Sequence, residues 1–450
     1  MSDLAEHERL EPTALTELLA SGSDDALADL VASMHPADLA EALDRVEEPA
    51  AKLRLIATLD AKIASQVLRD ARESARTLLL AGLSDARLTE ILEHLDTDDA
   101  ADLIGGLPDE RRRVLLQRTD AETRREVAEL LTYAGDTAGG IMKAEVPAVS
   151  ASASIRTVVE YLRRNGEKLH DAWDVFVVDD ERRVIGRIPL RGLILSDDRQ
   201  LVGDVMDTNV VSVRADTDQE EVAHLFEKYD LMTAPVVDSA DRLVGCVTVD
   251  DIVDVIEEEA TEDMLGLAGV SGAAVEIDGA MRSVRSRLPW LALNLLTAAV
   301  SAATITVFEG TIRVLAVAAA LMTIVASQGG NAGVQTMTLV VRGLALGELT
   351  TNQLSRIIRR ELTIAATNGC VLGSACALAV YAWRRDARLS AVVGAALLAN
   401  CLVAALLGSL VPIGLKLLRV DPAVSSSVFV TAGTDVAGFL IFLALLTWAL

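Results

Sequence analysis

The sequence SSSVFVTAGTDVAGFLIFLALLTWAL, residues 425–450, is an apolar segment that contains a single carboxylate, Asp435. An α-helix needs roughly 20 apolar residues to cross the hydrocarbon of a bilayer. Residues 436–450 provide only 15, so a spanning helix has to begin earlier and carry Asp435 inside the membrane. A charge at that depth costs about 2.5–3.5 kcal/mol on insertion scales and usually faces a wet cavity or a partner. The segment therefore predicts a membrane helix with a group that attracts cations.

An alternative interpretation makes Asp435 the N-cap of a short buried helix, with Thr434 beside it. The rest of the chain favours the membrane interpretation, since four further apolar segments precede this one. Together they predict five membrane helices, at residues 288–308, 312–328, 363–383, 389–413 and 427–449.

Charge is divided unevenly along the 450 residues. After Arg287 there are 10 Lys and Arg and 6 Asp and Glu, whereas 31 and 60 precede that point, so the two parts carry about +4 and −29. A first part this acidic argues against a nucleic-acid partner and attracts cations, although negative charge also simply keeps a domain soluble.

The cysteines and histidines suggest no metal centre and no disulfide framework. The four cysteines have neither zinc-like nor disulfide-like spacing, three of them lie in apolar segments, and the five histidines are scattered. No phosphate-binding loop or nucleophile arrangement is present either, so the chain is predicted not to be an enzyme. The first ten residues have neither a basic start nor an apolar core, which predicts no cleaved signal.

Residues 1–135 predict an α-helical N-terminal domain with a superhelical stack of short helices. Leu and Ala recur every three or four residues in segments such as PADLAEAL and TEILEHL. Pro36 with Asp38, and Asp98 with Asp99, look like helix starts.

Residues 136–262 contain a duplication about 60 residues apart. VPAVSASASIRTVVEYLRR predicts strand, turn and helix, and AWDVFVVDDERRVIGRIPL predicts a hairpin that turns at residues 179–182. The same order returns in VVSVRADTDQEEVAHLFEKYD and TAPVVDSADRLVGCVTVDDIVDVIEEE. This βαββα repeat resembles a pair of α+β CBS domains, at residues 136–202 and 203–262.

Residues 263–287 predict a partly helical connection to the all-α transmembrane domain of residues 288–450. Its end is basic, which places the soluble part in the cytoplasm by the positive-inside tendency. Most later basic residues agree with that orientation: Arg342, Arg356, Arg359, Arg360, Lys416 and Arg419. Three disagree, namely Arg384, Arg385 and Arg388. The majority places Leu450 outside the cell membrane.

The second apolar segment continues into IVASQGGNAGVQTMTLVVRGLALGE, residues 324–348. Its small residues allow helix backbones to approach closely within lipid. Asn331 and Gln335, four residues apart, present amides on one helix face. Ordinary interhelical hydrogen bonds would explain them, but together with Asp435 they suggest a polar path.

Several motifs in combination resemble the MgtE family of magnesium transporters and channels. They are LPWLALN, GGNAG-x-Q with VVRGLALGE, DPA fourteen residues before Asp435, and VTVDDIVDVIEEEATED at the end of the duplication. With the helical first domain, the resemblance covers essentially the whole chain.

The resemblance implies a homodimer with five membrane helices per subunit and a pore on the two-fold axis. It places Asp435 and Asn331 in the pore, with Gln335 nearby, and makes residues 263–287 a connecting (plug) helix. Two carboxylates across such an axis suit Mg²⁺, which keeps its water and prefers oxygen ligands. Four positions depart from the family pattern and leave the ion preference less certain: Thr323, Val334, Val428 and Ala432.

The resemblance also implies that Mg²⁺ binds acidic residues between the N-terminal and CBS domains and near the membrane, and thereby closes the pore. The implied regulatory residues are Asp99, Asp102, Glu220, Asp230, Asp251, Asp254, Glu259, Glu262 and Asp263. From the residues alone, a solvated acidic face is the better explanation of Asp251 and Asp254.

Other ligands and functions stay open. CBS pairs often bind ATP, but Gly192 stands after Arg191 where many CBS repeats have a ribose-binding Asp. The ion could be Co²⁺, Mn²⁺ or Zn²⁺, although neither His nor Cys lies at the predicted pore. A membrane-anchored CBS nucleotide sensor is the alternative of a different class, but a passive anchor has no use for Asp435.

Overall fold

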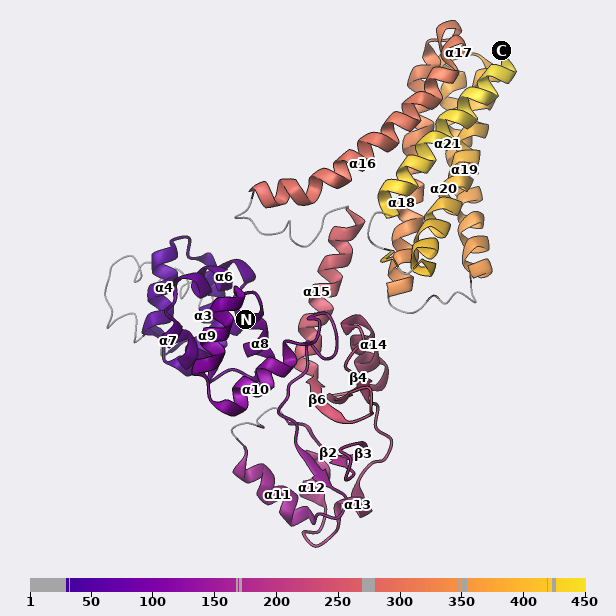
Figure 1. The fold of residues 1–450 in the computed structure, drawn as a ribbon. Helices are drawn as coiled ribbons and strands as arrows, with labels where there is room; N and C mark the ends of the chain where they lie inside the picture. Colours follow the sequence, from indigo (N-terminus) through magenta and orange to yellow (C-terminus); the bar gives the residue numbers. More distant parts are fainter. Residues whose placement is uncertain are drawn as a thin grey trace. The chain divides into compact units, whose positions relative to one another are not determined.

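The computed structural model describes residues 30–31, 33–166, 169, 172–268, 280–345, 349, 354–418, 420–422 and 426–450. The chain forms two compact units, residues 1–256 and residues 257–450 (Figure 1). The first contains a helical domain followed by two small mixed sheets, and the second contains long helices. The predicted multidomain architecture is confirmed.

The helical domain consists of short helices of eight to ten residues: α3 (Pro36–Arg45), α4 (Pro49–Thr58), α5 (Ala61–Asp70), α6 (Glu73–Gly82), α7 (Asp85–Leu92), α8 (Thr97–Gly105), α9 (Asp109–Arg118) and α10 (Ala121–Leu130). Most of them pack on the next helix but one, as α3 does on α5 and α5 does on α7. Helices this short are marginal alone in water, so their stability comes from packing. The leucines that recur in the sequence, such as Leu39, Leu43 and Leu79, are fully buried between them.

The two repeats have the same topology. The first has β1 (Ala148–Ser150), α11 (Ile155–Arg164), β2 (Asp174–Val178), β3 (Val184–Pro189), α12 (Leu190–Leu195) and α13 (Val202–Val205). The second has β4 (Val213–Arg214), α14 (Gln219–Tyr229), β5 (Thr233–Val237), β6 (Leu243–Thr248) and α15 (Val249–Leu267). In each three-stranded sheet the first pair of strands is parallel and the second pair is antiparallel.

The two hairpins turn in the same way. Arg182 and Asp241 take the left-handed backbone conformation, with φ of 64° and 60°. Before each of them an aspartate, Asp179 or Asp238, accepts hydrogen bonds from the backbone N–H groups two and four residues later, at 2.8–3.0 Å. Such turns favour residues whose side chains can bond to their own backbone. The predicted hairpin at residues 179–182 and the predicted repeat are confirmed.

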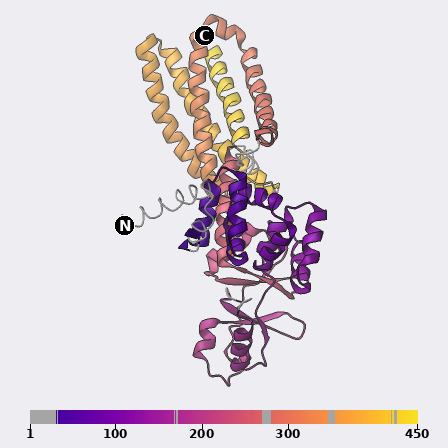
Figure 2. The same cartoon turned by 90° about the vertical axis from the view of Figure 1, so that its left-hand side faces the viewer.

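The second unit contains α16 (Ala280–Val307), α17 (Glu309–Val314), α18 (Val317–Ala345), α19 (Leu354–Arg384), α20 (Ala387–Leu417) and α21 (Ser426–Ala449). Five of these helices are long and apolar enough to cross a membrane, all except the short α17. α21 contacts α16, α18 and α20, and lies between α16 and α18 (Figure 2).

The extent predicted for the second span, residues 312–328, is wrong. The span begins at Val317, because the short α17 occupies the preceding residues, and α18 continues to Ala345. Its glycines do not end the helix, since they pack against neighbouring helices. Thr323 lies inside α18 without a break, and its hydroxyl donates to Ala320 O at 2.7 Å.

The connection of residues 263–287 is helical at both ends. Residues 263–267 complete α15, and residues 280–287 begin α16. Residues 269–279 of the predicted connecting helix lie outside the described residues.

Candidate functional site

Three membrane helices meet through small residues. A Cβ atom on Gly333 of α18 would lie 2.7 Å from Val430 Cγ1 and 3.3 Å from Thr434 Cγ2 of α21. A Cβ atom on Gly408 of α20 would lie 2.6 Å from Gly333 O. The distances of 2.7 Å to Val430 and 2.6 Å to Gly333 O are too short for a side chain, so α18 approaches α20 and α21 closely.

This contact brings two of the predicted pore residues, Asn331 and Asp435, to nearly the same level of the bundle. Gly330 of α18 faces Thr434 of α21, with 3.9 Å between its ideal Cβ position and the hydroxyl oxygen. Asn331 and Asp435 are the next residues on these two helices. Thr434 itself is fully buried, and its hydroxyl bonds within α21 to Val430 O at 3.0 Å.

In a single subunit Asp435 is half-buried, whereas Asn331 and Gln335 are exposed. None of the three is sealed in the interior. Asp435 lies well inside α21, which begins at Ser426, so the alternative in which it caps the start of a short helix is wrong.

Two buried polar residues of the bundle were missed in the sequence. Asn400 of α20 is fully buried, and Glu361 of α19 is 4% exposed. Glu361 Oε2 accepts from the Thr336 hydroxyl at 3.4 Å, and its Oε1 lies 3.7 Å from Arg360 Nη1. Each is a polar residue in or beside an apolar segment, which is the signal that would have identified it.

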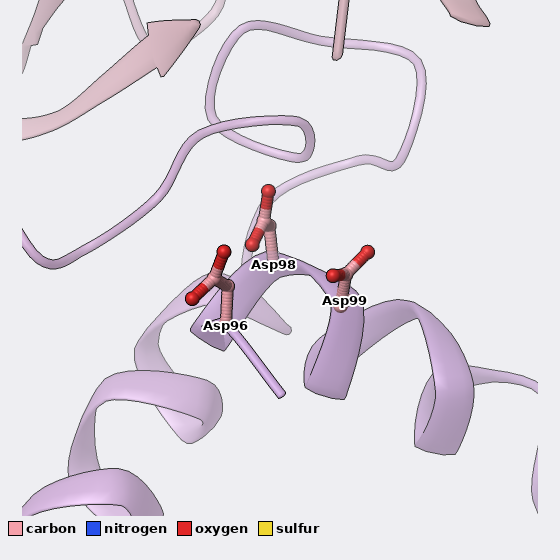
Figure 3. Close-up of side chains that lie close together, drawn as sticks. All are labelled: Asp96, Asp98 and Asp99. Atoms are coloured by element: carbon pink, nitrogen blue, oxygen red, sulfur yellow. The ribbon is translucent and has the colours of Figure 1, made fainter. Parts of the chain in front are cut away.

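The first unit contains a cluster of carboxylates at the start of α8. Potential ligand atoms of Asp96, Asp98 and Asp99 all lie within 4.8 Å of one another. Figure 3 shows that the three side chains extend from one helical turn. Asp96 is the N-cap residue, and the other two belong to the first turn, where the helix dipole favours negative charge.

A lysine joins this cluster to the end of the second repeat. Lys143 Nζ lies 3.4 Å from Asp96 Oδ2, 3.4 Å from Asp250 Oδ2 and 3.8 Å from Asp251 Oδ2. Lys143 is 8% exposed, and the Thr248 hydroxyl donates to Asp251. The helical domain and the start of α15 therefore share one buried cation.

More carboxylates than cations lie in this cluster, and the pKa values of three of the carboxylates are raised. Burial, and then Asp251, raises the pKa of Asp98 well above its usual value. Burial also raises the pKa of Asp99 to about 7 and that of Asp251 to about 6, against the opposing effects of Arg69 and Lys143 respectively. Burial would lower the pKa of Lys143, but the surrounding carboxylates, led by Asp251, raise it. Crowded carboxylate oxygens of this kind suit a hard divalent cation.

The structure brings together only part of the predicted regulatory set. Asp99 and Asp251 act electrostatically on each other in the cluster. Asp102 and Asp254 are exposed on α8 and α15. Sequence reasoning gave no regulatory role to the cluster members Asp96, Asp98, Asp250 and Lys143, although it identified Asp98 as part of a helix start. The DTDD run at residues 96–99 was the available signal for the first two.

The other predicted regulatory residues lie elsewhere. Glu220 is in the first turn of α14, 4.0 Å from His224 Nε2, and Asp230 ends that helix with φ of 50°. Glu259, Glu262 and Asp263 lie on the part of α15 that belongs to the second unit. There, burial raises the pKa of Asp263, and the nearby acids Asp421, Glu259 and Glu262 raise it further.

A cleft that is open to solvent lies between the two repeats. Its lining includes Arg187, Asp207, Asn209 and Tyr229. Arg187 is already paired, at 3.3 Å from the buried carboxylate of Asp174 and 3.8 Å from Asp207.

Family models match three parts of the chain. The MgtE model, described as a divalent cation transporter, matches residues 322–445. The MgtE intracellular N domain matches residues 34–136, and the CBS domain matches residues 138–196 and 202–258.

Relatives of known name agree. The magnesium transporter MgtE of Thermus thermophilus is 37% identical over 327 residues, which are 72% of each chain. The magnesium transporter MgtE of Enterococcus faecalis is 35% identical over 322 residues, which are 72% of this chain and 71% of that one.

Among solved structures, the cytosolic domain of the Mg²⁺ channel MgtE in complex with ATP is 38% identical, with a TM-score of 0.51. The match covers 54% of this chain and 99% of that one. The soluble part of a magnesium transporter is 29% identical, also with a TM-score of 0.51, over 56% and 99% of the two chains. These relatives are transporters rather than enzymes, and the chain belongs to the MgtE family of divalent cation transporters.

Proposed function

We propose that this chain forms a homodimeric Mg²⁺ channel or transporter of the plasma membrane, and that cytosolic Mg²⁺ closes it. The observation that carries the proposal is Asp435, a half-buried carboxylate inside a membrane helix. Such a group is costly in lipid, and an aqueous path for a cation explains it.

Oxygen ligands support Mg²⁺ as the ion. The path would be lined by the carboxylate of Asp435 and the amides of Asn331 and Gln335. All five histidines precede residue 257, so the bundle offers no imidazole for a softer metal such as Zn²⁺ or Co²⁺. A hydrated Mg²⁺ can be held through its waters by such oxygens.

The surface of one subunit supports a dimer. Asn331, which is close to the level of Asp435, is exposed there, and so is Gln335 one turn further along α18. The face of α16 is also little covered, since Leu291 is 62% exposed and Leu295 is 73% exposed. A second copy on a two-fold axis would bring two Asp435 carboxylates to one path.

The charges at the ends of the spans support a cytoplasmic first unit. Five antiparallel spans put the start of α16, the α18–α19 connection and the end of α20 on one side. That side carries Arg285, Arg287, Arg342, Arg356, Arg359, Arg360 and Lys416. The positive-inside tendency makes it the cytoplasmic side.

Closure by Mg²⁺ is supported by the carboxylate cluster of α8 and α15. Divalent cations would relieve the repulsion among Asp98, Asp99 and Asp251, and would thereby favour the arrangement in which α8 lies against the start of α15. The single helix α15 (Val249–Leu267) belongs to both units, which gives ion binding a covalent route to the second unit. This is allostery through differential binding to two states.

ATP is a candidate ligand of the CBS pair. The cleft near Arg187 offers Tyr229, whose ring is 5.0 Å from Lys228 Nζ, as an apolar surface beside cations. The relative solved with ATP favours the same ligand for this chain. Gly192 provides no carboxylate for the ribose, so we expect weak binding, which calorimetry with ATP on the full-length protein would measure.

Transport is tested by growth of a Mg²⁺-auxotrophic strain that carries the wild type, Asp435→Ala or Glu309→Gln. Glu309 is an exposed acid that pairs with Arg313 outside the long helices, so its variant should rescue growth like the wild type. Asp435→Ala should not rescue growth. Rescue by all three chains would contradict the proposed path.

Closure is tested by patch recording of Asp251→Asn/Asp254→Asn. We expect this variant to stay open at high cytosolic Mg²⁺, whereas the wild type closes. Normal closure of the variant would exclude these two residues from the regulatory site.

A further inference from the structure

Asn400 occupies the junction of three membrane helices. It is fully buried in α20, and its Nδ2 donates a hydrogen bond of 2.9 Å to Val325 O of α18. Because a backbone carbonyl only accepts hydrogen bonds, this contact fixes which end of the amide faces α18. The opposite end, Oδ1, is buried and has no hydrogen-bond partner among the described residues.

Two glycines make room for this amide. A Cβ atom on Gly329 of α18 would lie 2.0 Å from Asn400 Nδ2, and one on Gly438 of α21 would lie 2.7 Å from the same atom. The second position would also lie 3.2 Å from Ala326 Cα. The amide therefore lies directly against the backbones of α18 and α21, and its size sets their separation.

The two glycines are close in sequence to the residues of the path. Gly329 precedes Asn331 by two residues, and Gly438 follows Asp435 by three, which is less than one helical turn. A change in the separation of the helices at Asn400 is transmitted through rigid backbone to both path residues.

Stability does not explain an asparagine at this position. A buried acceptor without a partner costs about 1–3 kcal/mol, and an apolar side chain of similar shape would carry no such cost. Leucine would fill nearly the same volume in an apolar bundle. The amide is therefore better explained by what it does to its neighbours.

We propose that Asn400 is a positioning residue for ion passage, which sets the spacing of Asn331 and Asp435 by holding α18 and α21 against its amide. This inference rests on the proposed transport of Mg²⁺ along those residues. It adds to that function a residue of α20 that does not itself contact the ion.

The test uses the full-length protein in proteoliposomes, with initial rates of Mg²⁺ uptake measured over a range of Mg²⁺ concentrations. Asn400→Leu should fold, with a thermal unfolding midpoint no lower than that of the wild type. Its half-saturating Mg²⁺ concentration should rise by about fivefold or more, and its uptake of Co²⁺ relative to Mg²⁺ should change.

Ser409→Ala is the matched control. Ser409 is also fully buried on α20, but its hydroxyl bonds to Ala405 O of the same helix at 2.8 Å. Its removal should leave half-saturation and ion preference within about twofold of the wild type. If the wild type and this control do not transport Mg²⁺, the proposed function fails; if they do and Asn400→Leu matches them, only the role of Asn400 fails.

A second pair of variants separates packing from positioning. Gly329→Ala should lower the unfolding midpoint, because its Cβ meets the amide. Gly329→Ala/Asn400→Ala should recover part of that midpoint, because the amide is gone, but it should keep the altered half-saturation. Wild-type transport by the folded double variant would overturn the inference. Failure of both Asn400→Leu and the double variant to fold would also overturn it, since Asn400 would then be needed for folding alone.

Discussion

The membrane bundle and the acidic junction of the first unit differ in how they hold polar side chains. The acidic junction is Lys143 together with Asp96, Asp98, Asp99, Asp250 and Asp251. In the bundle, the buried groups Asn400 and Thr434 are neutral and bond to backbone carbonyls, and Glu361 is the charged exception among the buried polar residues described there. In the junction, Asp98, Asp99 and Asp251 are crowded together around one lysine. In the bundle, polar side chains fix the distances between helices. In the acidic junction, carboxylates repel one another, and a proton or a metal ion can relieve that repulsion. Access to water explains the difference. Water can deliver ions to the acidic junction but not to side chains packed between the membrane helices.

The largest effect on transport is expected at Asp435, the carboxylate inside the membrane helix α21. Asp435→Asn keeps the shape of the side chain but removes its attraction for cations, so Mg²⁺ uptake in proteoliposomes should fall at least about tenfold. Glu309→Gln, outside the long helices, should transport normally. If Asp435→Asn retains more than half of the wild-type Mg²⁺ uptake, the charge of Asp435 is not needed for transport.

The second effect concerns the cation that the junction already holds. Lys143→Met leaves Asp96, Asp250 and Asp251 without it, and breaking a buried ion pair costs about 3–5 kcal/mol. In EDTA, amide hydrogen exchange should therefore accelerate in α8 and at the start of α15. Millimolar Mg²⁺ should restore most of the protection, because it replaces the missing charge.

Lys228→Met provides the control for this experiment. Lys228 is exposed and lies over the Tyr229 ring, so its loss should leave exchange in α8 unchanged. If the Lys143 variant exchanges like the wild type without Mg²⁺, the junction does not depend on its internal cation.

The third effect is a pH dependence of the junction. The folded-state pKa values of about 7 for Asp99 and about 6 for Asp251 lie above the ordinary value of 3.8. The folded state then holds more protons than the unfolded state, so its stability is full below about pH 4 and decreases as pH rises through 6 and 7. The slope is at most about 1.4 kcal/mol per pH unit for each group.

The measurement is the thermal unfolding midpoint of the first unit within the full chain, in EDTA, between pH 5 and 7.5. The midpoint should fall across this window, and millimolar Mg²⁺ should flatten the curve. Asp216 and Asp238, whose pKa values are lowered by their arginine neighbours, are already ionised there and add no slope. A midpoint that rises with pH in EDTA would show that the carboxylates are not destabilised.

The smallest effect lies at the edge of the bundle. Lys416 Nζ donates to Leu344 O at 2.9 Å and so satisfies a carbonyl at the end of α18. Lys416→Met should destabilise the bundle by about 1–2 kcal/mol, a shift of a few degrees in its unfolding midpoint. Arg356→Met, which changes an exposed residue of α19, should cause no shift. Equal shifts would show that net charge, rather than this hydrogen bond, is responsible.

Local patterns predicted much of the fold. The duplication was visible because each hairpin repeats its turn chemistry, with Asp179 and Asp238 in equivalent places. The second membrane span was the clearest error, since the predicted residues 312–328 start before and end well before the observed helix Val317–Ala345. Inside that helix the glycines pack closely on neighbours, as Gly333 does on Val430.

The candidate sites were predicted less completely. Asp435 could be named from the sequence, because a charge in an apolar segment is a local feature, whereas Asp99 was named from the family resemblance. The roles of Lys143 and Asn400 could not be predicted, since each depends on partners far along the chain: Asp250 is 107 residues after Lys143, and Val325 is 75 residues before Asn400.

The sequence by itself determined that five apolar helices follow an acidic helical domain and a duplicated α+β pair. The period of the hydrophobic residues, the turn residues and the charge all depend on residues that are close together in the sequence. Only the tertiary structure decided which carboxylates share a lysine and which amide separates two membrane helices. Burial and distance between remote segments set those relations, and neither quantity exists until the chain has folded.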